Sequence, residues 1–272
     1  MTDTSTFSLL APGEPPAFEI VNPAGSSSAF LICDHASNRV PARLGSLGLT
    51  EAQRADHIAW DPGAAEMARR LSVLLDAPLV LSGYSRLVID CNRPRTNPQL
   101  MASQSAGVPV PGNTAITDED SAARLSQLFE PYHEAVETLL AARADRPTTL
   151  LSIHSFTPDI GDGEPRPWRI AIAYGRDDRL ARLLIPALRA DGTIVGDNQP
   201  YSVTADSDYS IPVHGERRGI PHVLVETRQD GIRTPETAWQ WAEKLAAAYR
   251  SIEADAIRLT QSAGAAPPVD RR

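Results

Sequence analysis

Two histidines stand at the ends of short apolar runs, a placement that favours metal binding. His35 follows residues 29–33, and His154 directly follows residues 149–153. A histidine is unusual beside an apolar strand unless its ring nitrogens have partners, and neutral imidazole is a common ligand of zinc and similar metals. The carboxyl ends of strands in an open α/β sheet are where functional groups gather. The two imidazoles are therefore predicted to share one metal ion.

A catalytic zinc ion usually has three protein ligands and leaves one position for water. The candidates for the third ligand are Asn38, Asp56, His57 and Asp61. A neutral amide is a weak ligand for zinc, so a carboxylate is preferred to Asn38. Asp61 has an equally good structural interpretation, because it can be the N-cap of a helix with Pro62 at its first position.

Glu226 ends a further apolar run, residues 222–225, so a carboxylate is expected at the edge of a buried strand. Such a group can act as a general base that takes a proton from a reacting water. An ion pair between Glu226 and Arg228 is the structural alternative.

Asn92 and Arg93 follow the apolar run of residues 86–90. Arginine holds a carboxylate through its planar fork, and asparagine can do so through its amide. The pair is predicted to bind a carboxylate of the substrate. A phosphate or solvent contact on a loop, or an ion pair within the fold, is the alternative.

The two cysteines, Cys33 and Cys91, lie beside these motifs. One of them could be a nucleophile with His35 or His154 as its base, which would make the protein a cysteine hydrolase. A free cysteine in an apolar strand is more often a small core residue. Two cysteines also require no disulfide framework.

The composition favours a globular protein. The chain has 272 residues, of which 42% are hydrophobic, and this is enough to bury a full core. The net charge of -8 argues against general binding to nucleic acid or to anionic membranes. We find no secretory signal pattern and no apolar run long enough to span a bilayer, so a cytoplasmic location is expected.

Apolar runs of strand length alternate with helical patterns along the chain. Expected strands cover residues 29–33, 77–81, 86–90, 149–153, 168–174 and 222–226. Expected helices begin after Thr50 and at Asp61 and cover residues 118–146, 178–189 and 234–262, with long loops at 92–117 and 201–219. This alternation predicts a single α/β domain with a mostly parallel central sheet and helices on both faces. Residues 1–24 are expected to be an extended lead-in, residues 25–262 the domain and residues 263–272 a flexible tail.

Several motifs together resemble the N-formylglutamate amidohydrolase family. They are Cys-Asp-His-Ala-Ser-Asn at residues 33–38, His-Ile-Ala-Trp-Asp-Pro-Gly-Ala at 57–64, Ser-Arg-Leu-Val-Ile-Asp-Cys-Asn-Arg-Pro at 85–94, Pro-Tyr-His at 131–133 and Ser-Ile-His-Ser at 152–155. The resemblance extends over roughly residues 20–260. It implies a zinc-hydrolase fold similar to that of the zinc carboxypeptidases and of succinylglutamate desuccinylase.

Similarity to the zinc carboxypeptidases implies that His35 and His154 are metal ligands. Those enzymes carry a glutamate ligand three residues after the first histidine, where this chain has Asn38. The third ligand is therefore assigned to Asp61. The Asp-x-Asn-Arg motif of those enzymes, which holds the substrate carboxylate, matches residues 90–93.

The resemblance implies a zinc-dependent amidohydrolase whose substrate is a small anionic N-acyl amino acid. The expected reaction converts N-formylglutamate to glutamate and formate, with Glu226 as general base and Arg86 stabilising the oxyanion. The expected substrate-binding residues are Asn92, Arg93, His214 and Arg217, the last two on a loop around Tyr209 that closes over the substrate. The alternatives are hydrolysis of another N-acyl amino acid or of a cell-wall peptide, and a non-catalytic binding protein on the same fold.

Overall fold

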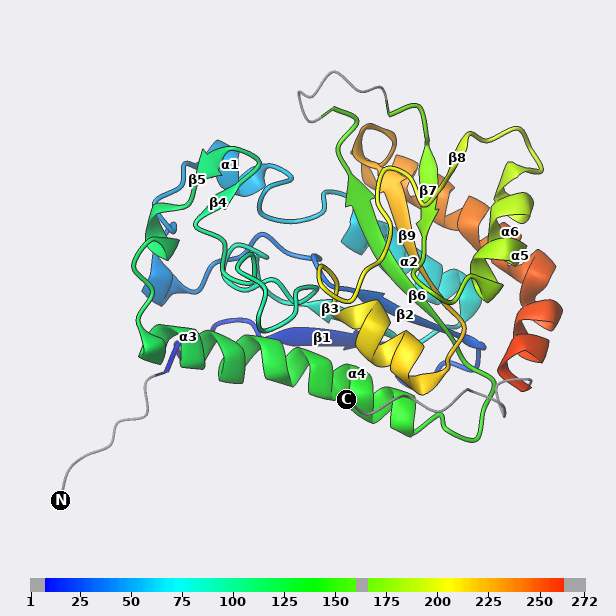
Figure 1. Cartoon of the computed structure of the whole chain (residues 1–272), viewed down its shortest axis with the longest axis horizontal. Helices are drawn as coiled ribbons and strands as arrows, with labels where there is room; N and C mark the ends of the chain where they lie inside the picture. Colours follow the sequence, from blue (N-terminus) through cyan, green and yellow to red (C-terminus); the bar gives the residue numbers. More distant parts are fainter. Residues whose placement is uncertain (1–7, 160–165, 262–272) are drawn as a thin grey trace.

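The computed structural model describes residues 8–159 and 166–261. Its centre is a seven-stranded sheet with the strand order β1-β3-β2-β6-β9-β7-β8 (Figure 1). These strands are β1 (Phe18–Val21), β2 (Ala29–Cys33), β3 (Leu79–Ser82), β6 (Thr149–Phe156), β7 (Ile170–Ala173), β8 (Val195–Asp197) and β9 (His222–Arg228). A separate two-stranded ribbon consists of β4 (Gln104–Ser105) and β5 (Val108–Pro109). The α-helices are α1 (Glu51–Ala55), α2 (Ala64–Leu75), α3 (Asp118–Arg124), α4 (Glu130–Ala141), α5 (Arg179–Arg189) and α6 (Pro235–Gln261).

The four central strands of the sheet run parallel. β2 pairs in parallel with β3 and β6, and β6 pairs in parallel with β9, whereas β1 and β7 join this group in antiparallel fashion. The carboxyl ends of β3, β2, β6 and β9 therefore meet at one edge of the sheet. The mostly parallel sheet with helices on both faces confirms the predicted fold class.

Alternate residues of the strands pack against different helices. Leu31 of β2 faces the apolar core that α2, α5 and α6 form on one side of the sheet. Phe30 and Ile32 face the opposite side, where they pack with Tyr132 and Val136 of α4. Burial on both sides explains why the central strands read as continuous apolar runs rather than as alternating patterns. No helix within residues 8–159 and 166–261 is long and apolar enough to cross a membrane.

The predicted strand at residues 86–90 is wrong. The chain forms a turn here, in which the backbone N–H of Val88 donates to the carbonyl of Ser85. Leu87, Val88 and Ile89 instead fill a second apolar cluster beneath the loops. Periodicity alone cannot distinguish a short buried strand from a buried turn of the same composition.

The helix expected to start at Asp61 begins later. α2 starts at Ala64, and its N-cap is Gly63, whose φ is 82°. Glycine adopts this left-handed conformation at little cost, and a Cβ at this position would lie 2.2 Å from the carbonyl oxygen of Ile232. Asp61 is therefore not the N-cap, and its carboxylate is available for contacts at the edge of the sheet.

Other segments differ from the prediction in detail. The sequence analysis predicted no strand at the positions of β1 and β8. β1 lies within residues 1–24, the segment expected to be an extended lead-in. The predicted helix at residues 118–146 is confirmed as α3, a π-helical turn (Leu125–Phe129) and α4. The expected tail at residues 263–272 lies outside the described residues.

Candidate active site

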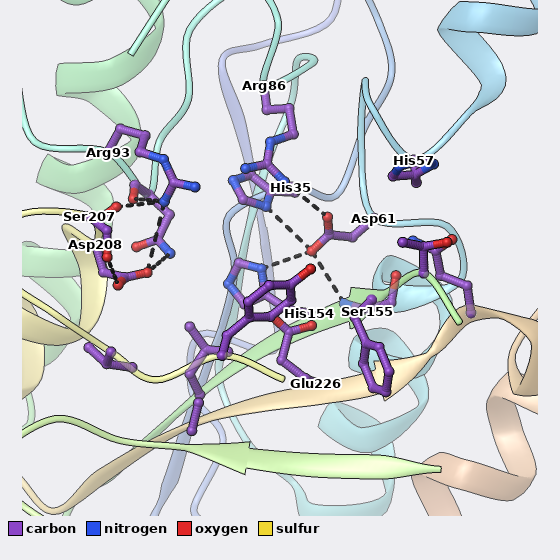
Figure 2. Close-up of a pocket in the computed structure, with 18 of the residues that line it drawn as sticks. His35, His57, Asp61, Arg86, Arg93, His154, Ser155, Ser207, Asp208 and Glu226 are labelled. Carbon is purple, nitrogen blue, oxygen red and sulfur yellow. Dashed lines mark hydrogen bonds and ion pairs between the residues drawn. The ribbon is translucent and has the colours of Figure 1, made fainter. Parts of the chain in front are cut away.

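Four side chains from different elements meet at the carboxyl edge of the sheet. His35 lies two residues beyond β2, and His154 and Glu226 lie opposite each other on β6 and β9. Asp61 comes from the segment between α1 and α2. All four line one cavity of about 360 Å³ (Figure 2). The two strands continue for two residues beyond His154 and Glu226, so both side chains have a rigid backbone.

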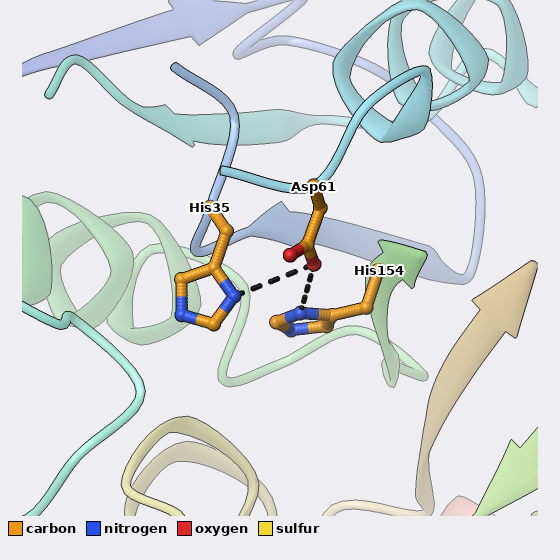
Figure 3. Close-up of side chains that lie close together, drawn as sticks. All are labelled: His35, Asp61 and His154. Atoms are coloured by element: carbon orange, nitrogen blue, oxygen red, sulfur yellow. Dashed lines mark hydrogen bonds and ion pairs between the residues drawn. The ribbon is translucent and has the colours of Figure 1, made fainter. Parts of the chain in front are cut away.

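His35, Asp61 and His154 form a compact group of possible metal ligands (Figure 3). Asp61 Oδ2 lies 3.3 Å from His35 Nδ1 and 2.8 Å from His154 Nδ1. The three ligand atoms all lie within 4.8 Å of one another. Two bonds of about 2 Å to one zinc ion at the tetrahedral angle separate their ligand atoms by about 3.3 Å, close to the two distances from Asp61 Oδ2. Two imidazoles and one carboxylate therefore fit a divalent metal ion.

Carboxylates also hold the outer nitrogens of both imidazoles. His35 Nε2 lies 2.7 Å from Asp90 Oδ1, and His154 Nε2 lies 3.0 Å from Asp34 Oδ2. Histidines that bind metals commonly donate their second N–H in this way, which fixes the tautomer and the orientation of the ring. With Nε2 protonated, the lone pair on each Nδ1 is available to a metal.

Asp34 is held in turn by hydroxyl groups from three segments. Tyr132 and Ser210 donate to its Oδ1 at 2.8 and 2.5 Å, and Ser152 donates to its Oδ2 at 2.9 Å. The side chain is almost fully buried, at 1% exposure. A buried carboxylate with this many donors has one orientation, and it transmits that orientation to His154.

The electrostatics of this group favour a cation. Burial alone would lower the pKa of His154, but the carboxylates of Asp34 and Asp61 raise it well above its ordinary range. With Asp90, three buried carboxylates surround the two imidazoles. A divalent ion would balance this negative charge and displace the protons from the ring nitrogens that face Asp61.

Glu226 is a buried carboxylate with a free oxygen. Its exposure is 8%, and its Oε2 has no hydrogen-bond partner within the described part of the chain. Burial, with a further contribution from the Asp61 carboxylate, raises the pKa of Glu226 to about 7. A carboxylate with a pKa near neutrality can both accept and return a proton. Arg228, its suggested partner, instead pairs with Asp230.

Arg86 lines the same cavity and contacts two of the acids. Its Nη2 lies 2.8 Å from Asp90 Oδ2, and its Nη1 lies 3.6 Å from Asp61 Oδ1. Burial opposes its charge, but the two carboxylates outweigh this effect and raise the pKa of Arg86. The guanidinium is therefore a fixed positive charge beside the possible metal ligands, where it can stabilise negative charge on a substrate oxygen.

Arg93 lies to one side of the His35–Asp61–His154 group (Figure 2). Its Nη1 donates to the carbonyl of Ser207 at 2.5 Å, and its hydrogen bonds to other described residues all use this nitrogen. Its Nε and Nη2 are therefore available to a ligand in the cavity. A planar guanidinium with two donors to spare suits a carboxylate.

Asn92 lines the cavity, but its amide is already engaged. Its Nδ2 donates to Asp208 Oδ1 at 3.0 Å, and its Oδ1 accepts the backbone N–H groups of Tyr209 and Ser210. These bonds fix the segment of residues 207–210 against the loop that carries Arg93. Asn92 thus positions the walls of the cavity and has little capacity left for a substrate carboxylate.

The remaining candidates for a third ligand lie apart from the two imidazoles. Asn38 does not line the cavity, and its Nδ2 donates to the carbonyl of Arg54 at 3.0 Å. His57 lines the cavity, but its Nδ1 lies 2.8 Å from Asp56 Oδ1 and it is outside the ligand group. The structure thus brings Asp61, and not Asn38, Asp56 or His57, to the two imidazoles.

His214 and Arg217 are not brought to the cavity either. The segment Ile211–Gly215 forms a π-helical turn that packs on β6 and β9. This packing directs His214 into the interior, where its Nε2 lies 3.0 Å from His133 Nδ1. Arg217 is exposed on the following turn. The apolar residues of the segment bury it against the sheet, so it does not close over the cavity as the sequence suggested.

The cysteines do not have the surroundings of a nucleophile. Cys33 and Cys91 are both buried, and neither lines the cavity. Burial raises the pKa of each thiol well above its usual range. Since the thiolate is the reactive form, the structure opposes a cysteine hydrolase.

Asp34 and Asp90 are the site residues that the sequence analysis missed. Each one is close in sequence to a residue that was singled out, Asp34 beside His35 and Asp90 two residues before Asn92. Their positions beside these residues could have indicated that they belong to the site, but not which histidine each carboxylate contacts. Asp34 holds His154 rather than the adjacent His35, and only the folded chain reveals that pairing.

Comparisons with known proteins give one family match and several similar solved structures. The model of the N-formylglutamate amidohydrolase family matches residues 27–233, a range that includes all four central side chains. A gene product of Agrobacterium tumefaciens of known structure is 34% identical, with a TM-score of 0.85 over 90% of this chain and 99% of that chain. An N-formylglutamate amidohydrolase from Ralstonia eutropha JMP134 is 17% identical, with a TM-score of 0.64 over the same shares of the two chains. A search of curated proteins found no match.

Proposed function

The chain belongs to the N-formylglutamate amidohydrolase family, and on this premise we propose that it is a metal-dependent hydrolase of N-acyl amino acids. The observation that carries the proposal is the His35–Asp61–His154 group with the free carboxylate of Glu226 in the same cavity. The proposed substrate is a small anionic N-formyl amino acid, and N-formylglutamate is its first candidate because of the family.

His35, His154 and Asp61 would hold the metal ion, which when bound supplies a Lewis acid to polarise the substrate carbonyl and to acidify a water. Zinc is the proposed ion, because two imidazoles and a carboxylate are a common ligand set for catalytic zinc. Asp90 and Asp34 keep the two imidazoles in the tautomer that can bind it.

Glu226 is the proposed general base. Its free Oε2 accepts a proton from the attacking water and later delivers that proton to the nitrogen of the leaving amino acid. Arg93 binds the substrate carboxylate through Nε and Nη2 and so places the amide bond beside Glu226. Arg86 stabilises the charge that develops on the carbonyl oxygen.

The decisive experiment combines metal analysis with a panel of substrates. The purified protein is expected to bind about one divalent ion per chain, and a chelator is expected to abolish hydrolysis until the metal is restored. N-formyl, N-acetyl and longer N-acyl derivatives of glutamate are compared with the same derivatives of neutral amino acids. Turnover that is insensitive to chelation would overturn the metal mechanism, and absence of turnover of every substrate would favour a non-catalytic binding protein.

The identity of the third ligand has a separate test. Asp61→Asn should reduce the metal content and affinity strongly, because an amide is a poor substitute for a charged ligand. Asn38→Ala is the matched control, since Asn38 lies outside the possible ligand group and its amide donates to the carbonyl of Arg54, so its loss should leave the bound metal unchanged. A variant of Asp61 that retains full metal content would remove it from the ligand set.

A further inference from the structure

A second cavity, of about 320 Å³, lies at the opposite edge of the sheet. Thr148 and Pro221, which line it, immediately precede β6 and β9. Its walls also carry three arginines, Arg143, Arg146 and Arg218, and we name it the arginine cavity. None of the described residues that line it is an aspartate or a glutamate. Three positive charges around one cavity are unexpected in a chain whose net charge is -8.

Two of the three guanidinium groups have no carboxylate partner in the part of the chain that the structure describes. Arg143 Nη1 donates to the carbonyl of Gly25 at 3.1 Å, and its Nη2 donates to that of Ser27. Arg146 Nη2 donates to the carbonyl of Ser26 at 3.1 Å. These bonds hold the turn before β2, but backbone carbonyls do not neutralise the positive charges.

Arg143 also retains an unsatisfied donor. Arg143 is only 5% exposed, and its Nε has no hydrogen-bond partner among the described residues. Burial, together with repulsion from Arg146, lowers the pKa of Arg143. Buried charges in proteins are normally paired, and buried donors are normally bonded. Arg143 meets neither expectation.

Arg218 adds a third charge from another part of the chain. It follows the π-helical turn, and its Nη2 lies 2.8 Å from Glu137 Oε1 on α4. That pair leaves the other guanidinium nitrogens of Arg218 without a carboxylate among the described residues. The three arginines thus approach one cavity from two separate segments, the end of α4 and the turn before β9.

We propose that the arginine cavity binds a small oxyanion, either a carboxylate or a phosphate group. The oxyanion supplies the ion-pair partner that Arg143 and Arg146 lack among the described residues, and it accepts the free N–H of Arg143. Guanidinium groups suit both anions because their donors lie in one plane and can bind two oxygens together. Thr148, which lines the arginine cavity, and His154 are six positions apart along the chain, so this site lies about 20 Å from the candidate active site along the strand.

Calorimetric titration of the full-length, metal-loaded protein with inorganic phosphate, and separately with acetate, tests the proposal. Saturable binding of at least one of the two anions is expected. The double variant Arg146→Gln/Arg218→Gln should weaken that binding about 10-fold or more. Arg143 is kept, because it is buried and holds the turn before β2 through both Nη atoms, whereas Arg146 holds it through Nη2 alone. Arg182→Gln is the matched control, since Arg182 is an exposed arginine on α5 that pairs with Asp178. The Arg182→Gln variant should bind the anions as tightly as the wild type does.

The two anions distinguish the possible ligands. Tighter binding of phosphate assigns the cavity to phosphate-bearing molecules, and tighter binding of acetate assigns it to carboxylates. Absence of saturable binding of either anion overturns the proposal. Binding that is equally strong in the double variant also overturns it, because the anion then occupies another site, such as the one at Arg93. Thermal unfolding of each variant shows that the fold is intact.

Discussion

The carboxylate of Asp61 contacts both imidazoles through a single oxygen, and its second oxygen faces Arg86. This arrangement gives the residue two roles at once, as a possible metal ligand and as a counter-charge for a cation. Glu226 lines the same cavity but is outside the possible ligand group, and its Oε2 lacks a hydrogen-bond partner among the described residues. The two carboxylates therefore have different surroundings, and this difference is the basis of the different roles proposed for them.

Glu226→Gln should lower kcat by about 100-fold or more, because the amide cannot accept a proton from water. The substitution preserves the size of the side chain, so the metal content and the thermal stability should be unchanged. Steady-state kinetics with N-formylglutamate measure the effect. A variant with near-normal kcat would remove Glu226 from the role of general base.

Arg93→Ala should raise KM about 10-fold or more for substrates that carry a carboxylate, through loss of a charge-assisted pair of hydrogen bonds. The same substitution should have little effect on an N-formyl amino acid amide that lacks the carboxylate. Comparison of KM for the two substrates in both proteins checks the assignment. Equal losses for both substrates would contradict it.

At the scale of elements, the parallel pairing of β6 and β9 places His154 directly opposite Glu226. A shift of one residue would turn one of the two side chains to the other face of the sheet. The apolar residues on either side of each strand prevent such a shift, since they must meet the helices on both faces. The register that builds the core therefore also builds the site.

Asp34→Asn should weaken zinc binding about 10- to 100-fold, the usual cost of losing a carboxylate that orients a metal-bound histidine. Competition with a coloured chelator measures the affinity without reference to activity. Ser210→Ala, which removes one donor to Asp34 but leaves the carboxylate, should have a smaller effect. If the affinity of the Asp34 variant equals that of the wild type, the bond from His154 does not contribute to metal binding.

At the scale of the whole molecule, the fold buries a neutral pair of histidines beneath the loops. His133 Nε2 donates to the carbonyl of Cys91, so its Nδ1 must accept the N–H of His214 Nε2. Burial, with the neighbouring His214, lowers the pKa of His133 to about 3, and burial lowers the pKa of His214 to about 4. Both rings therefore remain neutral in the folded protein at pH values where the unfolded chain binds protons.

The free energy of unfolding should consequently fall as the pH decreases from about 6.5 towards 4. Each histidine contributes up to about 1.4 kcal/mol per pH unit over that window, and its contribution is complete above pH 6.5. Urea unfolding of the chelated wild type and of His133→Gln/His214→Gln at several pH values measures the difference. The raised pKa of His154 makes its own contribution nearly constant below pH 6.5, and that contribution is common to both proteins, so it cancels in the comparison. An identical slope for the two proteins would refute the role of this pair.

The sequence by itself determined which polar groups stand at the ends of the central strands. Apolar runs located β2, β6 and β9, and the polar residues at or just beyond their ends marked His35, His154 and Glu226. These features depend on local order along the chain, which is why they could be recognised without a structure. The turn at residues 86–90 escaped recognition because burial in a turn leaves the same apolar pattern as burial in a strand.

Only the tertiary structure decided how these groups are connected. It brought Asp61, the residue that the sequence analysis had assigned as third ligand, beside the two imidazoles, and it placed Gly63 rather than Asp61 at the N-cap of α2. It paired Asp34 with His154, directed His214 into the interior and assembled the arginine cavity from distant segments. Each of these outcomes depends on contacts between residues far apart in sequence, and the order of residues along a chain does not specify such contacts locally.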